Sequence, residues 1–280
     1  MIARFGRAGR LVRRGGAVGL ILPALLLALW EALSRFGIAP ANLLPAPSVV
    51  LRSLRDLAVT GELFQHIAIT LLRVAEGFVL GTAVATVAAA LTGYSARWRL
   101  LLDPTLQALR SIPSIAWIPL FVLWLGISEA SKVTLIALGA FFPVYLNTMA
   151  GILQVDRKLV EVARIHGYTG VALVRRVLLP ATLPAYVTGL RGGLGLAWMF
   201  VVAAEYLGAS EGLGFLLIDG QETGRPASII AAILLFAIFG KLSDVLLAAL
   251  GRRFVSWQDS FQSVEERKSD AADQARLQEV

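Results

Sequence analysis

The sequence predicts an all-α membrane protein with six transmembrane helices. Hydrophobic residues make up 57% of its 280 residues and charged residues only 16%, with a mean hydropathy of +0.72. That composition is too apolar for a soluble domain with a polar surface. Apolar runs near the roughly 20 residues that cross a bilayer recur along the chain. Cysteine is absent, which excludes disulfides, thiolate catalysis and Cys-ligated metals.

Six segments are the expected spans. Uncharged runs occupy 77–96, 111–128 and 133–155, whereas 15–33, 177–204 and 226–251 are short or carry isolated charges. We expect one membrane domain over residues 17–258, preceded by a basic segment, 1–16, and followed by a polar tail, 259–280.

The lysines and arginines indicate the orientation. Most of them fall in four segments: the amino terminus, the short loop at 97–99, the loop at about 156–180 and the tail. Cytoplasmic loops are the ones enriched in basic residues. We therefore expect both termini in the cytoplasm. The net charge of +7 is then explained by a protein in a lipid bilayer, and no nucleic-acid partner is expected. The alternative is a signal peptide cleaved after Ala32-Leu-Ser34, which would leave five spans.

After the first span, Leu44-Pro-Ala-Pro47 stops the chain and Ser48 is a possible helix cap. The apolar residues that follow fall on one helical face: Val50, Leu51, Leu54 and Leu57. Two interpretations stay open, an interfacial helix on the outer membrane surface and a connector packed on its own subunit.

Pro113 and Pro119 lie six residues apart in one apolar run. Each removes a backbone donor and clashes with the preceding turn, so we expect a kinked or broken helix. Such breaks often border a translocation pathway, although a plain structural kink is the alternative. The pairs Gly77-x3-Gly81 and Gly189-x3-Gly193 allow close helix approach.

Ionisable residues inside spans are costly and usually paired. Arg73 with Glu76, and Lys241 with Asp244, are spaced to meet on one helix face. Arg191 has no local partner and lies about 13 Å into its span by helical rise.

Two readings of Arg191 stay open. Either Asp244 neutralises Arg191 or Lys241 within the bundle, or the surplus positive charge lines an anion pathway. The further candidates for the pathway lining are Trp117, Asn147 and Trp198. Glu205 is expected at the outer membrane interface.

The sequence lacks the patterns of a soluble enzyme. His66 and His166 fall on opposite sides of the membrane and in no metal-binding spacing. Residues 208–214 are glycine-rich but follow a span, so they predict an external turn. Gly240-Lys241 lacks the rest of a P-loop. The chain is therefore not expected to be catalytic, and any ATP must be hydrolysed by another subunit.

The most informative motif is cytoplasmic: Glu161-x-Ala163-x3-Gly167-x9-Val177-x-Leu179-Pro180. It resembles the coupling loop of ABC importer permeases, in which two short helices sit in a cleft of the ATPase subunit. The resemblance implies ATPase coupling by Glu161, Ala163, Arg164, Gly167 and Pro180. Glu161 would cap or orient the first helix and Gly167 would permit its tight turn. Val162 and His166 depart from the residues common in the family.

The resemblance extends from about residue 44 to 257. Its further motifs are Leu44-Pro-Ala-Pro47, Asp103-Pro-x5-Arg110-x-Ile-Pro113, Trp117-Ile-Pro-Leu-x3-Trp-x-Gly-Ile127, Leu179-Pro-x3-Pro184-x4-Gly189-Leu-Arg191 and Ala204-Glu205-x6-Gly212-Leu-Gly214. They are similar to permeases for nitrate, sulfonate, taurine and bicarbonate. Three stretches favour the aliphatic-sulfonate branch: 61–69, 142–148 and 240–244.

The family implies an importer-type ABC permease fold in the bacterial plasma membrane. It also implies a second copy of this chain, two ATPase subunits that bind ATP and Mg, and an external substrate-binding protein. No cofactor is expected in this chain. A stand-alone secondary transporter is the rival class, but it predicts ion-coupling carboxylates in related halves, which the sequence does not show. A membrane-embedded enzyme is a more distant third.

Overall fold

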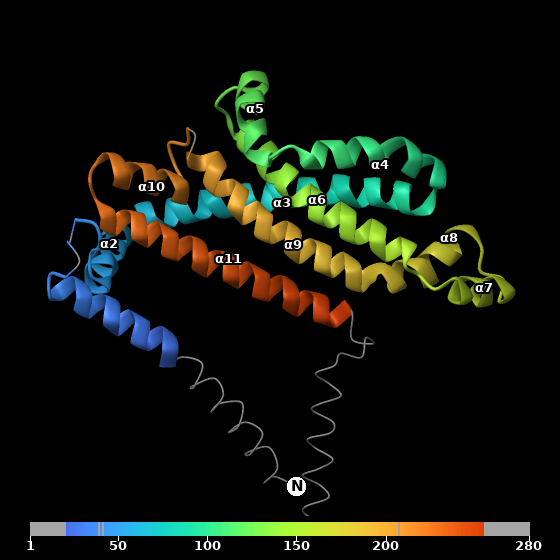
Figure 1. Cartoon of the computed structure of the whole chain (residues 1–280), viewed down its shortest axis with the longest axis horizontal. Coiled ribbons are helices and arrows are strands. Elements are labelled where there is room, and N and C mark those ends of the chain that lie inside the picture. Colours follow the sequence, from blue (N-terminus) through green and yellow to red (C-terminus); the bar gives the residue numbers. More distant parts are fainter. Residues whose placement is uncertain (1–20, 39, 41, 207, 255–280) are drawn as a thin grey trace, which may run out of the picture. The chain divides into compact units, whose positions relative to one another are not determined.

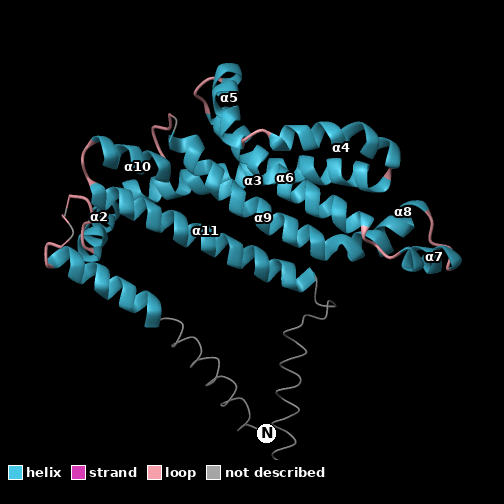
Figure 2. Cartoon of the chain, viewed as in Figure 1, coloured by secondary structure: helices cyan, strands magenta, loops and turns pink. Residues whose placement is uncertain are grey.

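The computed structural model of the chain describes residues 21–254, apart from 39, 41 and 207. The described residues form helices and loops with no strand among them (Figure 2). The predicted basic segment 1–16 and polar tail 259–280 lie outside this part of the chain. Two compact units are present, one comprising residues up to Leu72 with Val202–Ile238, the other Arg73–Val201 and residues from Phe239.

Residues 21–35 are helical, and the elements labelled in Figure 1 follow. These are α2 (Pro47–Thr60), α3 (Glu62–Tyr94), α4 (Ala96–Ser111), the 3₁₀-helix η1 (Ser114–Trp117), α5 (Ile118–Leu125), α6 (Glu129–Leu153), α7 (Arg157–Ile165), α8 (Gly170–Leu173), the π-helix η2 (Val174–Leu178), α9 (Leu179–Tyr206), α10 (Leu213–Glu222) and α11 (Pro226–Phe254). Four helices in the described chain are long and apolar enough to cross a membrane, or five if a bent pair counts as one span. The first expected span, 15–33, is only partly described, so the count of six stays a prediction.

Both predicted glycine pairs lie where helices of the second unit touch. A Cβ on Gly77 would lie 2.6 Å from the side chain of Ile136, and Gly81 faces the backbone of Ala137. On α9, Gly193 would place a Cβ 2.9 Å from the carbonyl oxygen of Ala140. Because side chains would not fit, the glycines let α3 and α9 approach α6 closely.

The pairing of residues gives the helix directions in this unit. Gly77 faces Ile136 and Gly93 faces Ile152, so α3 and α6 run parallel. Gly151 faces Ala185 while Gly139 faces Phe200, so α6 and α9 run antiparallel. The chain between α3 and α6 must therefore return along their length, and α4, η1 and α5 make that return.

The returning segment is broken, as Pro113 and Pro119 predict. The pair formed by residues 96–111 and 115–125 bends by 91°, and Figure 1 shows α5 turned away from α4. The predicted span 111–128 was wrong in its bounds, because a helix already begins at Ala96. This helix contains Arg97, Arg99 and Asp103, and a search for uncharged runs could not find it.

The helix α2 packs on its own unit. Val50 is buried, Leu54 and Leu57 are half-buried, and the hydroxyls of Ser53 and Ser228 lie 3.3 Å apart. Leu51, on the same predicted face, is 66% exposed, so the packed connector and the interfacial helix both stay open.

Ser48 does not cap α2. Its N–H and hydroxyl donate to the Glu31 carboxylate, at 3.1 Å and 2.8 Å, because the N-cap residue, Ala46, offers no side-chain acceptor.

Candidate functional site

The cytoplasmic loop contains a helix with defined ends. Asp156 is the N-cap of α7, and its carboxylate accepts from the Lys158 N–H at 2.9 Å. At the other end Gly167 has φ +81°. The Gly167 N–H donates to the Arg164 carbonyl at 2.9 Å and the Tyr168 N–H to the Ala163 carbonyl at 3.0 Å. This pair of bonds is a Schellman motif, which favours glycine at the left-handed position.

Gly167 therefore permits the tight turn that the sequence predicted. Glu161 does not cap α7, because it lies inside the helix and Asp156 precedes it; the alternative, that Glu161 orients the helix, stays a prediction. A capping side chain must come just before the first turn, where its oxygen reaches the free N–H groups.

One face of α7 is apolar and exposed. Leu159, Val162 and Ile165 recur every three residues, and Ile165 is 83% exposed. Ala163, on another face, is buried, while Glu161 and Arg164 are exposed. An exposed apolar stripe edged by charge is the pattern of a helix that docks on another protein.

The chain returns from α7 through α8 and η2. Arg176 donates from Nη1 to the Tyr168 hydroxyl at 3.0 Å, and its guanidinium lies 5.2 Å from the centre of the same ring. Pro180 lies two residues after the π-helical turn Val174–Leu178, at the second position of α9. Proline removes a backbone donor and crowds the preceding turn, so a local change of helix type at this point has an identifiable cause.

Arg191 does have a partner, on α11. Its Nε and Nη2 donate to the two carboxylate oxygens of Asp244, at 2.8 Å and 2.9 Å. Lys241 Nζ lies 3.9 Å from Asp244 Oδ2, so the expected contact between those two side chains is present.

Trp198 lies two turns after Arg191 on α9, and the structure places both against α11. Its indole Nε1 donates to the Ser243 hydroxyl at 2.8 Å, and the ring lies over Gly240, where an added Cβ would meet it at 3.7 Å. Trp198 is buried. It therefore fixes the register in which the charges of α9 and α11 meet.

The other two pathway candidates lie elsewhere in the second unit. Asn147, on α6, donates from its side chain to the Pro143 carbonyl at 2.8 Å. Trp117, in η1 beside the helix break, stacks on Phe121 with ring centres 6.0 Å apart. Among the described residues, the hydrogen-bond partner of Arg191 is Asp244 and neither of these two side chains.

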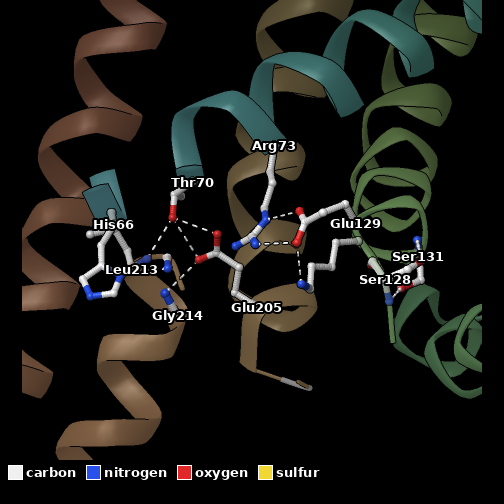
Figure 3. A network of polar contacts seen from close by, with 11 residues as sticks. His66, Thr70, Arg73, Ser128, Glu129, Ser131, Glu205, Leu213 and Gly214 are labelled. Carbon is white, nitrogen blue, oxygen red and sulfur yellow. Dashed lines mark hydrogen bonds and ion pairs between the residues drawn. The ribbon is translucent and has the colours of Figure 1, made fainter. Parts of the chain in front are cut away.

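The sequence did not predict a polar cluster in the first unit, shown in Figure 3. Three successive backbone N–H groups at the start of α10 find side-chain acceptors from other helices. Gly212 donates to His66 Nδ1 at 3.0 Å, Leu213 to Thr70 Oγ1 at 2.8 Å and Gly214 to Glu205 Oε2 at 2.8 Å. The N-cap Gly212 has no side chain, so this helix terminus is capped from α3 and α9 instead.

Glu205 lies near the end of α9 (Leu179–Tyr206), and its expected depth at the outer membrane interface stays a prediction. Glu205 is 0% exposed and accepts from the Thr70 hydroxyl on both oxygens, at 2.8 Å and 3.0 Å. Gly214 allows this approach, because a Cβ there would lie 2.5 Å from the Cβ of Glu205.

A second cluster lies in the other unit (Figure 3). Glu129, at the start of α6, accepts from Arg73 Nε at 2.6 Å and Nη2 at 2.7 Å. It also accepts from Lys132 Nζ at 2.7 Å. Both cations are buried. Arg73 was expected to meet Glu76, and this distant partner was missed.

The comparisons with known proteins show the family of the chain. A family model described as the inner membrane component of binding-protein-dependent transport systems matches residues 77–256, which is well over half of the chain. The chain belongs to this family. Members are ABC transporter permeases, so the protein is a multi-pass inner membrane permease of the importer class.

Curated relatives narrow the class. A Bacillus subtilis (strain 168) protein, provisionally named as the aliphatic sulfonates permease SsuC, is 42% identical over 89% of this chain and 91% of its own length. The Escherichia coli (strain K12) protein of the same name is 38% identical over 86% and 91%. The taurine permease TauC of Escherichia coli (strain K12) is 33% identical over 85% and 89%.

The permease relatives are not themselves catalytic. Within the described chain, no group of three or more His, Cys, Asp or Glu side chains could hold a metal ion.

Proposed function

We propose that this chain forms the translocation path of an ATP-driven importer for aliphatic sulfonates. The choice of aliphatic sulfonates as the substrate rests on sequence identity, which is higher to the two SsuC proteins, at 42% and 38%, than to TauC, at 33%. Taurine is the second candidate, because TauC also matches over most of both chains. Nitrate and bicarbonate are the remaining members of the anion group.

The proposed assembly contains two copies of this chain, two ATPase subunits and an external binding protein. Each copy would have six spans within residues 17–258 and both termini in the cytoplasm. Family membership supports the partners in general. The positive-inside distribution of lysine and arginine supports the orientation.

We propose that α7 docks on the ATPase through its exposed face, Leu159, Val162 and Ile165. Apolar side chains held in water favour burial in a partner's cleft. Arg164 and Glu161 would contact polar groups at the rim, and buried Ala163 would hold α7 to its own chain. The Schellman turn at Gly167 and the π-turn before Pro180 would transmit ATPase closure to α9.

The path candidates have unequal support. Arg191 lies in the middle of a candidate span with its side chain half exposed. We propose it as the residue that meets the anion, with Trp117 and Asn147 as further lining. Trp198, being buried, would support Arg191 from behind.

Uptake by the reconstituted complex tests the proposal. Radiolabelled ethanesulfonate should enter proteoliposomes containing the permease, its ATPase and its binding protein, and unlabelled ethanesulfonate should compete better than taurine, nitrate or bicarbonate. Better competition by taurine would reassign the substrate. Undiminished uptake with an ATPase subunit unable to hydrolyse ATP would contradict the importer proposal and favour a stand-alone transporter.

A further inference from the structure

The charges on α9 and α11 lie far from the helix ends. Arg191 is the thirteenth residue of the 28-residue α9, and Lys241 the sixteenth of the 29-residue α11. At 1.5 Å per residue each lies about 18 Å or more from either end of its helix. Such positions fall within the hydrocarbon core of a bilayer that is about 30 Å thick.

The described residues leave these charges uncovered. The side chains of Arg191, Asp244 and Lys241 are 48%, 29% and 75% exposed. Exposed ionic groups at mid-membrane do not face lipid tails, because desolvation there is too costly. Something polar must therefore meet this face of the second unit.

Asp244 leaves one edge of Arg191 open. The carboxylate accepts hydrogen bonds from Nε and Nη2, and among the described residues no partner is found for Nη1. The Nη1–Nη2 edge is the fork that binds two oxygens of an oxyanion. Within the described part of the chain, Lys241 makes only the long 3.9 Å contact with Asp244, so two cations and one carboxylate share the surface.

There is room on α9 one helical turn from Arg191. Gly195 lies one turn after Arg191 on α9, is exposed, and a Cβ there would meet nothing within 4 Å. The hydrogen bond from Trp198 to Ser243 joins the two helices, α9 and α11.

We propose that Arg191, Asp244 and Lys241 form an oxyanion site inside the membrane. Its ligand is a small monoanion whose oxygens surround one central atom, such as a sulfonate. Arg191 supplies a two-oxygen fork, Lys241 supplies a mobile point charge, and Asp244 fixes the guanidinium. Asp244 also reduces the net charge to +1, which keeps binding weak enough for release. This inference rests on the proposed function and specifies its path.

Charge-selective labelling tests the site without transport. The chain has no cysteine, so Gly195→Cys introduces a single thiol beside Arg191. Membranes containing the whole complex are treated with sulfonatoethyl methanethiosulfonate, an anion, or with its trimethylammonium counterpart, a cation. Each rate is divided by the rate of the same reagent with 2-mercaptoethanol. Leu246→Cys, on an exposed apolar part of α11, is the matched control.

We expect Gly195→Cys to favour the anionic reagent by about tenfold, as a cationic cleft concentrates anions. Lys241→Gln added to this variant should remove most of the preference, whereas Lys241→Arg should keep it. Leu246→Cys should react with neither reagent. If Gly195→Cys fails to assemble, Thr188→Cys reports on the same exposed face one turn earlier.

The site would be overturned if neither reporter is labelled, as expected of a dry contact between copies, or if labelling shows no charge preference. A preference untouched by Lys241→Gln would also overturn it. Charge-selective labelling in a complex that takes up no sulfonate would instead contradict the proposed function and leave the oxyanion site standing.

Discussion

Replacing Glu205 with alanine should destabilise the protein, because the carboxylate accepts hydrogen bonds where water cannot replace it. Glu205 is 0% exposed. Without it, the Gly214 N–H loses its acceptor. The Thr70 hydroxyl, which itself accepts from the Leu213 N–H, loses the carboxylate to which it donates.

Each buried donor left unsatisfied costs about 1–3 kcal/mol, so the two together cost about 2–6 kcal/mol. Glu205→Gln keeps one carbonyl oxygen that can accept from both Thr70 and Gly214. Its cost should therefore be nearer to the ~1 kcal/mol of an ordinary hydrogen bond.

The assay is the midpoint of thermal unfolding in mild detergent, used to rank variants. A loss of ~3 kcal/mol lowers the midpoint by about 6–12 °C for a chain of this size class. Glu222→Ala is the matched control, since Glu222 is an exposed acid on α10 and should change the stability by less than about 0.5 kcal/mol. If Glu205→Ala and Glu205→Gln have the same unfolding midpoint, the argument that Glu205 caps α10 is refuted.

Three further outcomes are expected. Gly167→Val forces a branched residue to φ +81°, at a cost of about 1–2 kcal/mol, and ATP hydrolysis should continue while uptake falls; unchanged uptake would contradict the coupling role. Gly193→Ala places a methyl 2.9 Å from the Ala140 carbonyl and should lower the yield of folded protein, whereas Gly195→Ala, in open space, should not. Arg191→Gln should leave assembly intact and impair uptake; lost assembly that Asp244→Asn restores would make the pair structural and rule out the pathway role.

The helices were largely predictable, and the exceptions have a common cause. Prolines at 113 and 119 and the glycine pairs act through the backbone, so their effects appear wherever those residues occur. The helix Ala96–Ser111 was missed because its charges hid it from a search for apolar runs. One of them, Asp103, accepts from the Tyr145 hydroxyl of α6 at 3.1 Å.

The candidate site was predictable only where it is local. The turn at Gly167 depends on residues within one helix turn and was found. Glu129, a partner of Arg73, and Thr70, a partner of Glu205, are 56 and 135 residues away in sequence, and spacing rules cover only neighbours three or four apart. Those rules could pair Arg73 with Glu76 but could not find Glu129 or Thr70.

The energy of a buried charge separates the two kinds of ionic group found here. Glu205 is wholly buried and its oxygens accept from the chain's own donors. Those hydrogen bonds offset the desolvation cost of the carboxylate within one copy of the protein, so its role is structural. Arg191 and Lys241 lie equally far from the ends of their helices but stay exposed, and only part of their donor capacity is used. Because lipid cannot solvate them, their remaining partner must come from outside the described part of the chain. A transported anion supplies the opposite charge that such a surface lacks, whereas a second copy of the same surface would bring two more cations and one more carboxylate against it.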